Sequence, residues 1–115
     1  MIEIKRGDIW LVNLDPTIGY EIRKARPAVI IQNDIGNKYS PITIIAPVTS
    51  QNIDKIYPIE VLLTKENSGL DIVSKVLLNQ IRAIDKRRLT KKLGSVNAEI
   101  IEKINEALKI SLDLS

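Results

Sequence analysis

Short runs of β-favouring apolar residues, separated by residues that favour turns, constrain the fold of this 115-residue chain more than any other feature. The expected strands cover residues 8–14, 27–33, 42–49, 59–63 and 74–84. Strands this short, spaced by Asn, Asp, Gly and Pro, are typical of an antiparallel, barrel-like sheet. A domain of this size buries about 65% of the surface of its unfolded chain, so one core is enough. We therefore expect a single domain over residues 1–115.

The C-terminal part of the chain has a helical period instead. Apolar residues recur there at steps of three and four, and Asn97 stands where a helix cap is preferred. The pattern predicts a helix over residues 98–114 with one apolar stripe, formed by Ile100, Ile101, Ile104, Leu108 and Leu112. The predicted class is α+β, a small SH3-like antiparallel β-barrel with a C-terminal α-helix packed on it.

The segments between these elements carry less information. Residues 33–41 and 64–72 are rich in Asn, Gly and Ser, and we expect loops there. Pro47 lacks an N–H donor, which indicates a bulge or an edge position in its strand. We expect the strand over residues 74–84 to bend near Gln80, and residues 85–96 to begin with one helical turn and continue as a short strand.

The chain contains no His and no Cys, and this excludes several kinds of chemistry. A Ser-His-Asp triad, a thiolate metal site and a zinc site all need these side chains. The five glycines never form a phosphate-binding loop motif, and the carboxylates are scattered in sequence. The longest apolar run, ITIIAPV, is far shorter than the roughly 20 residues of a membrane span, so we expect a soluble, cytoplasmic protein.

The net charge of +3 permits an anionic partner without requiring one. Cations are concentrated between Arg82 and Lys92, where Asp85 is the one acid. This run could bind nucleic acid through phosphates, or it could protect a sheet edge from aggregation. Only four aromatic side chains occur, so a base-stacking platform is poorly supported; they are Trp10, Tyr20, Tyr39 and Tyr57.

Arg26 is the strongest single candidate for a functional side chain. Pro27 biases its backbone towards an extended conformation, and a planar guanidinium held in this way suits a phosphate or a carboxylate. An ordinary surface ion pair is the alternative. Thr49 ends a predicted strand, where a hydroxyl can cap a turn.

Four segments taken together carry a resemblance to a known family. The stretches KRGDIWLVNLDPTIGYE, ARPAVIIQND, APVTSQ and SKVLLNQIRAIDKRRL resemble, in order and spacing, the MazF/PemK family of toxin endoribonucleases. The resemblance extends over residues 5–112. It implies a toxin that needs no metal or other cofactor, works as a homodimer and cuts single-stranded RNA, such as mRNA, at a short sequence. It also implies a cognate antitoxin with an acidic, flexible tail, like MazE.

The same resemblance assigns the catalytic arginine to Arg26 and the catalytic threonine to Thr49. RNA can be cut by its own 2′-OH, so the protein needs only to align the bond, move two protons and stabilise the charge on the phosphorane. Because a guanidinium is a poor proton acceptor, we expect Arg26 to act mainly by electrostatic stabilisation. The group that acts as general base is left open.

We expect residues in loops and at strand ends near this pair to bind RNA, and we choose the candidates by their position in the sequence. The candidates are Tyr20, Glu21, Arg23, Lys24, Asn79, Gln80 and Arg82. Two features depart from the family pattern: Ile22, Arg23 and Lys24 replace a glycine-rich sequence, and Asn79 stands where some relatives have Glu. Arg23 and Lys24 could hold the RNA backbone, dock the antitoxin or stiffen the loop.

Two other functions compete with the ribonuclease. A CcdB-like toxin shares the barrel and the dimer but binds DNA gyrase, through a Trp near its C-terminus; here the single Trp is at position 10. A module that binds acidic peptides or RNA without cutting it is the other possibility, and turnover would distinguish it.

Overall fold

The computed structural model describes residues 3–14 and 25–115. In these residues the strands are β1 (Asp8–Asn13), β2 (Ala25–Ile30), β3 (Ile42–Thr49), β4 (Glu60–Leu63), β5 (Ser74–Leu77), β6 (Arg82–Asp85) and β7 (Leu89–Ser95). The helices are α1 (Asp34–Tyr39), α2 (Lys65–Ser68) and α3 (Ala98–Leu112), with 3₁₀ turns η1 (Leu78–Gln80) and η2 (Lys86–Arg88). The predicted α+β class with a C-terminal helix is confirmed.

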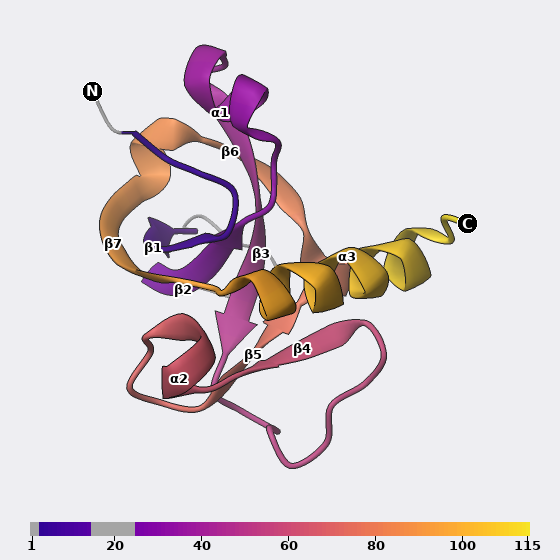
Figure 1. Ribbon diagram of the computed structural model, residues 1–115. Coiled ribbons are helices and arrows are strands. Elements are labelled where there is room, and N and C mark those ends of the chain that lie inside the picture. Colours follow the sequence, from indigo (N-terminus) through magenta and orange to yellow (C-terminus); the bar gives the residue numbers. More distant parts are fainter. Residues whose placement is uncertain (1–2, 15–24) are drawn as a thin grey trace.

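The strands form one antiparallel sheet in the order β4-β5-β3-β2-β1-β7, and β6 pairs with β3 beside β5. The sheet coils strongly, with α3 lying across it (Figure 1). Within the described residues no ladder joins the end strands β4 and β7, so the expected barrel is an open one.

The core consists of two clusters on opposite faces of the central strands. Val29 of β2 packs in the cluster under α3, with Ile9, Val48 and Ile104. Its neighbours Ala28 and Ile30 pack in the other cluster, which also contains Trp10 and Ile45. Since successive strand residues point to opposite faces, a strand buried on both faces must be continuously apolar. This explains the run AVI in β2.

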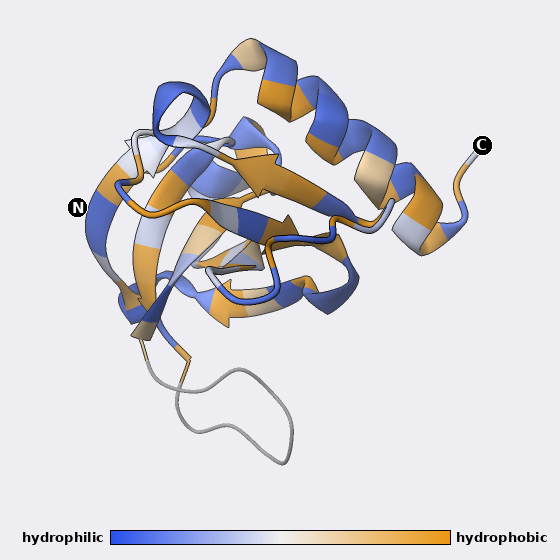
Figure 2. Ribbon diagram, turned by 90° about the horizontal axis from the view of Figure 1, so that it is seen from below, coloured by the Kyte–Doolittle hydropathy of each residue, from blue (hydrophilic) through white to orange (hydrophobic). Residues whose placement is uncertain are grey.

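Helix α3 begins as predicted at Asn97, whose side chain accepts a hydrogen bond from the Ile100 N–H (3.0 Å). Ile100, Ile104 and Ala107 are buried, and the apolar side of the helix faces the sheet (Figure 2). The predicted stripe continues beyond this packing, because Leu112 is half exposed.

The prediction of loops at 33–41 and 64–72 was wrong in part, since each segment contains a short helix. Asn33 caps α1 by accepting from the Gly36 N–H (2.8 Å), and Thr64 and Asn67 form a capping box on α2. Helices of six and four residues are too short to display an apolar period. Their capping residues were the available signal.

Pro47 lies neither at an edge nor at a bulge. It pairs with Ala28 of β2 on one side of the central strand β3. On the other side, β3 pairs with β6 up to Ile45 and with β5 from Val48 onward. Pro47 falls in the gap between these two partners, where a missing N–H donor leaves no ladder bond unmade.

The other strand predictions differ mainly at their ends. The strand expected over 74–84 is divided by η1 into β5 and β6, which places the expected bend at Gln80. The helical turn and strand expected after Asp85 are η2 and β7. β2 begins at Ala25, before the expected start, because Ala25 pairs with Asn13. Among the described residues, no helix is both long and apolar enough to cross a membrane.

Candidate functional site

Arg26 and Thr49 lie at the same end of two neighbouring strands. The β2–β3 ladder pairs Ala28 with Pro47. Arg26 precedes Ala28 by two residues and Thr49 follows Pro47 by two, so continuing the antiparallel register sets them opposite each other. Residues two apart in a strand share a face, so the two side chains lie on the face that also carries Ala28. The structure thus places the two side chains proposed for catalysis at the same end of β2 and β3.

Thr49 has a defined hydrogen bond at the end of β3. Its Oγ1 accepts from the backbone N–H of Gln51 at 3.1 Å, and the residue is half-buried. A hydroxyl that accepts a hydrogen bond keeps its own O–H for donation to another group. Thr49 is therefore suited to donate to an anionic oxygen placed beside Arg26.

Arg26 is half-buried in β2, where it pairs with Val12 of β1. It borders a hollow of about 440 Å³ that Val48, Ser50, Asp71 and Ile72 also line. A guanidinium offers five fixed donors and a permanent positive charge, which match a phosphodiester. The chemistry available here is binding and charge stabilisation of a phosphate.

Asn79, Gln80 and Arg82 lie further along the sheet. Asn79 and Gln80 are exposed in η1, and Arg82 begins β6 opposite Ile45. Ile45 is four residues from Thr49, which corresponds to about 13 Å along a strand. Within one chain these residues do not adjoin the Arg26–Thr49 pair.

Four of the predicted RNA-binding residues, Tyr20, Glu21, Arg23 and Lys24, lie outside the described residues. The connection that carries them leaves β1 at Asn13 and enters β2 at Ala25, and these two residues are paired. It therefore starts and ends next to Arg26.

Much of the basic run between Arg82 and Lys92 makes contacts within the chain. Lys92 pairs with Asp8 (3.4 Å), and the Lys86 ammonium donates to the carbonyl oxygen of Asn37. Arg87 hydrogen-bonds Asp85 and so lowers the pKa of that carboxyl. Lys86 and Arg87 line a separate hollow of about 1010 Å³ beside α1, away from Arg26.

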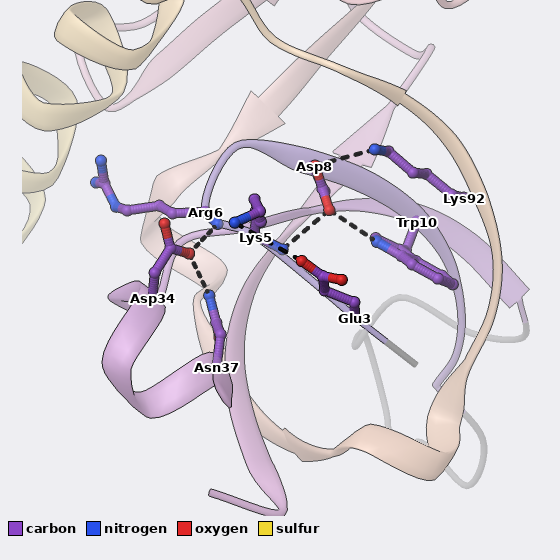
Figure 3. A network of polar contacts seen from close by, with 8 residues as sticks. All are labelled: Glu3, Lys5, Arg6, Asp8, Trp10, Asp34, Asn37 and Lys92. Atoms are coloured by element: carbon purple, nitrogen blue, oxygen red, sulfur yellow. Dashed lines mark hydrogen bonds and ion pairs between the residues drawn. The ribbon is translucent and has the colours of Figure 1, made fainter. Parts of the chain in front are cut away.

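A polar network beside this second hollow stabilises the N-terminal segment (Figure 3). Asp8 accepts from the Lys5 N–H (2.9 Å) and from the Trp10 indole (3.5 Å). Asp34 accepts from the Arg6 N–H at 2.7 Å, and this bond lowers the pKa of Asp34. Because these contacts tie the segment before β1 to α1, we interpret them as structural.

Sequence reasoning missed Lys75, which is 4% exposed and carries its ammonium into the base of the loop after Thr49. The alternation of its strand was the one available signal, and it was obscured because SKVL is buried at every position. Among the residues that the structure describes, no aromatic platform accompanies the site: Trp10 is buried, and the two tyrosines lie at α1 and in the loop at Tyr57.

The chain belongs to the family of PemK-like, MazF-like toxins of type II toxin-antitoxin systems, whose model matches residues 5–112. It is 43% identical over 111 residues to the "Endoribonuclease EndoA" of Bacillus subtilis, a match that covers 96% of both chains. The crystal structure of MazF from Deinococcus radiodurans superposes with a TM-score of 0.83 at 26% identity, covering 98% of this chain and 99% of that one.

A MazE–MazF complex from the same organism superposes with a TM-score of 0.78 at 26% identity, covering 99% of this chain and all of the other. These matches lend no support to a CcdB-like, gyrase-binding toxin.

Proposed function

We propose that this toxin is a sequence-specific endoribonuclease that cuts single-stranded RNA without a metal ion, within a single domain spanning the chain. The observation that carries the proposal is the placement of Arg26 and Thr49 at the same end of β2 and β3, with the Thr49 hydroxyl oriented by the Gln51 N–H. The 43% identity to a protein named as an endoribonuclease supports it.

In the proposed mechanism the RNA supplies its own nucleophile. The 2′-OH next to the scissile bond attacks phosphorus, the bond to the 5′ oxygen breaks, and a 2′,3′-cyclic phosphate forms. Arg26 donates to the non-bridging oxygens and stabilises the added negative charge, which is the largest contribution expected of such a site. Thr49 adds a neutral donor to the same oxygens, and Arg26 can also donate to the leaving 5′ oxygen.

RNA recognition in this proposal falls to side chains on both sides of the pair. Asn79, Gln80 and Arg82 address exposed base edges through amide and guanidinium groups. Tyr20, Glu21, Arg23 and Lys24 belong to the connection that starts and ends beside Arg26. An mRNA substrate would place the protein in the cytoplasm.

The proposed partners are a second copy of the chain and an acidic antitoxin similar to MazE. Exposed apolar residues at the end of α3, Ile110 and Leu112, support a homodimer. The homodimer suggested by the resemblance also led us to expect that the segment around Pro47 is partly exposed in a monomer. This expectation was wrong, because residues 45–48 are buried within the sheet. The MazE–MazF complex of similar fold supports an antitoxin of this kind.

Single-turnover cleavage of an RNA in EDTA, with 5′-end sequencing of the products, tests the proposal. We expect the wild-type chain to cut at a short recurrent sequence, and Arg26→Lys and Thr49→Ala to lose about 100-fold in rate, as for removal of one oxyanion donor. Lys103→Met, on the outer surface of α3, is the control. Wild-type rates in both site variants would refute the assignment, and binding without turnover would favour the non-catalytic module.

A further inference from the structure

Lys75 is a buried lysine whose ammonium holds the loop that follows Thr49. The side chain is 5% exposed, and its Nζ donates to the backbone carbonyls of Asn52 (3.0 Å) and Lys55 (3.2 Å). Its third partner is the Glu60 carboxylate at 2.9 Å, itself 10% exposed. All three donors of the ammonium are therefore used, and two of them are bonded to loop backbone.

The loop from Ser50 to Ile59 has little other internal support among the interactions that the structure describes. The Glu60 carboxylate accepts a hydrogen bond from the Tyr57 N–H (3.0 Å). The backbone of Asn52 lies in the left-handed region, with a φ of 54°. The side chains from Asp54 to Pro58 are exposed, so apolar burial cannot order this part of the loop. The end of the loop is also held beside β4, because the Glu60 N–H donates to the Tyr57 carbonyl (2.8 Å) and the Leu78 N–H donates to the Ile59 carbonyl (3.1 Å). Among the described interactions, Lys75 links the earlier part of the loop, at Asn52 and Lys55, to the sheet.

Lys75 is also the residue next to Thr49 in the sheet. The β3–β5 ladder pairs Thr49 with Lys75, and the β4–β5 ladder pairs Lys75 with Leu62. One side chain thus connects the strand that flanks Thr49, the loop that Thr49 enters, and the first residue of β4. The Gln51 N–H that orients the Thr49 hydroxyl belongs to this loop.

A buried ion pair seldom adds net stability, because removing both charges from water offsets their attraction. Replacing such a pair by apolar residues is often neutral for folding. The burial of Lys75 and Glu60 is therefore weak evidence that the pair serves stability. Here the ammonium makes two contacts to loop carbonyls that an apolar side chain cannot make.

We propose that Lys75, held by Glu60, is a positioning residue that fixes the loop after β3 and thereby sets the Thr49 hydroxyl for the reaction at Arg26. This inference rests on the ribonuclease function proposed above. Lys75 itself does not touch the substrate in this proposal. Its effect on rate passes through the loop backbone and the Gln51–Thr49 hydrogen bond.

The test compares Lys75→Met with the double variant Lys75→Met, Glu60→Leu. The single variant leaves a buried carboxylate without its partner and lowers the Tm, whereas the double variant removes both charges and recovers much of the Tm. Neither can bind the Asn52 and Lys55 carbonyls. Both should therefore lose about 10- to 100-fold in single-turnover rate, the cost of a small misplacement. Affinity for a substrate with a 2′-deoxy cut site should stay within about threefold.

Limited trypsin digestion reports on the loop without any RNA. Cleavage after Lys55 should be roughly tenfold faster in both variants, because it requires local opening of the loop. Val61→Ala is the control for lost stability, since Val61 is buried in β4 and makes none of these contacts. Val61→Ala should lower the Tm. At temperatures where this variant is folded, its rate of RNA cleavage and its rate of trypsin cleavage after Lys55 should both equal those of the wild type.

The outcomes separate the two proposals. A double variant that cuts RNA at the wild-type rate, or that resists trypsin like the wild type, would overturn the role of Lys75. A wild-type chain that cuts no RNA would instead refute the ribonuclease and, with it, the catalytic consequence of the loop. The trypsin result would still decide whether Lys75 holds the loop.

Discussion

The backbone of Gly94 in β7 lies directly against the carbonyl oxygen of Ser68 at the end of α2. A Cβ at Gly94 would be 2.4 Å from that oxygen, a distance that real Cβ atoms essentially never show. Gly94 also pairs with Ile9 in the β1–β7 ladder, and the nearby Asn97 N–H donates to the Asn67 carbonyl (3.1 Å). The backbone at Gly94 is held by β1, and a hydrogen bond joins the residues after β7 to α2. The two segments therefore cannot easily move apart.

Gly94→Ala should therefore destabilise the protein by about 3 kcal/mol, at the upper end of overpacking costs. Urea unfolding followed by circular dichroism measures this. Ser95→Ala, one residue further along β7 and exposed, should change stability by less than about 0.5 kcal/mol. Equal stability of the Gly94 variant and the wild type would show that β7 and α2 are more loosely joined than the structure describes.

Removal of the α3 cap should weaken the attachment of this helix. Asn97→Ala leaves the Ile100 N–H without its side-chain acceptor, and the expected loss is about 1 kcal/mol. Asn97→Asp keeps an acceptor in place and adds a negative charge at the helix N-terminus, so it should be at least as stable as the wild type. If the Ala and Asp variants unfold at the same urea concentration, the cap contributes nothing.

The Asp34 carboxylate should make part of the stability dependent on pH. The hydrogen bond from the Arg6 N–H holds the pKa of Asp34 below its ordinary value of 3.8 in the folded chain. This stabilisation is present above the unfolded pKa and is lost as the pH falls through the folded pKa. Asp34→Asn should be less stable than the wild type near neutral pH, and the difference should shrink below about pH 4.

Urea unfolding at a series of pH values measures this difference. Ile35→Ala, an exposed neighbour without a titratable group, is the control, and its difference from the wild type should not vary with pH. A deficit of Asp34→Asn that stays constant into acid would contradict the prediction.

Asn79→Glu should change the RNA sequence that is cut. An amide both donates and accepts hydrogen bonds, whereas a carboxylate only accepts, so the base edge that is preferred should differ. Sequencing of 5′ ends from a mixed RNA pool identifies the preferred sequence. Glu99→Gln, on the exposed surface of α3, should leave it unchanged. An unaltered sequence in the Asn79 variant would remove Asn79 from the recognition surface.

Elements with a sustained pattern were predictable from sequence. The strand over 42–49 has the predicted ends, because its eight residues are almost all apolar. Helix α3 begins at its predicted cap, because apolar residues recur at steps of three and four along its fifteen residues. The short helix α1 was missed because Asn33, Asp34 and Gly36 suit a turn as well as a capped helical turn. The position of Pro47 in a central strand was also missed. The strand beside β3 changes from β6 to β5 at Pro47, and this change can be seen only from the pairing of the strands.

Sequence by itself determined the class of fold, the family and the two side chains proposed for catalysis, because residue type, order and period are local properties of a chain. It also excluded histidine and thiolate chemistry by composition alone. Tertiary structure alone decided that Arg26 and Thr49 share one end of the sheet, and that Asn79 and Arg82 lie apart from them. It also decided that Lys75 turns inward to Glu60 and the loop carbonyls, since strand register and burial depend on contacts between residues distant in sequence.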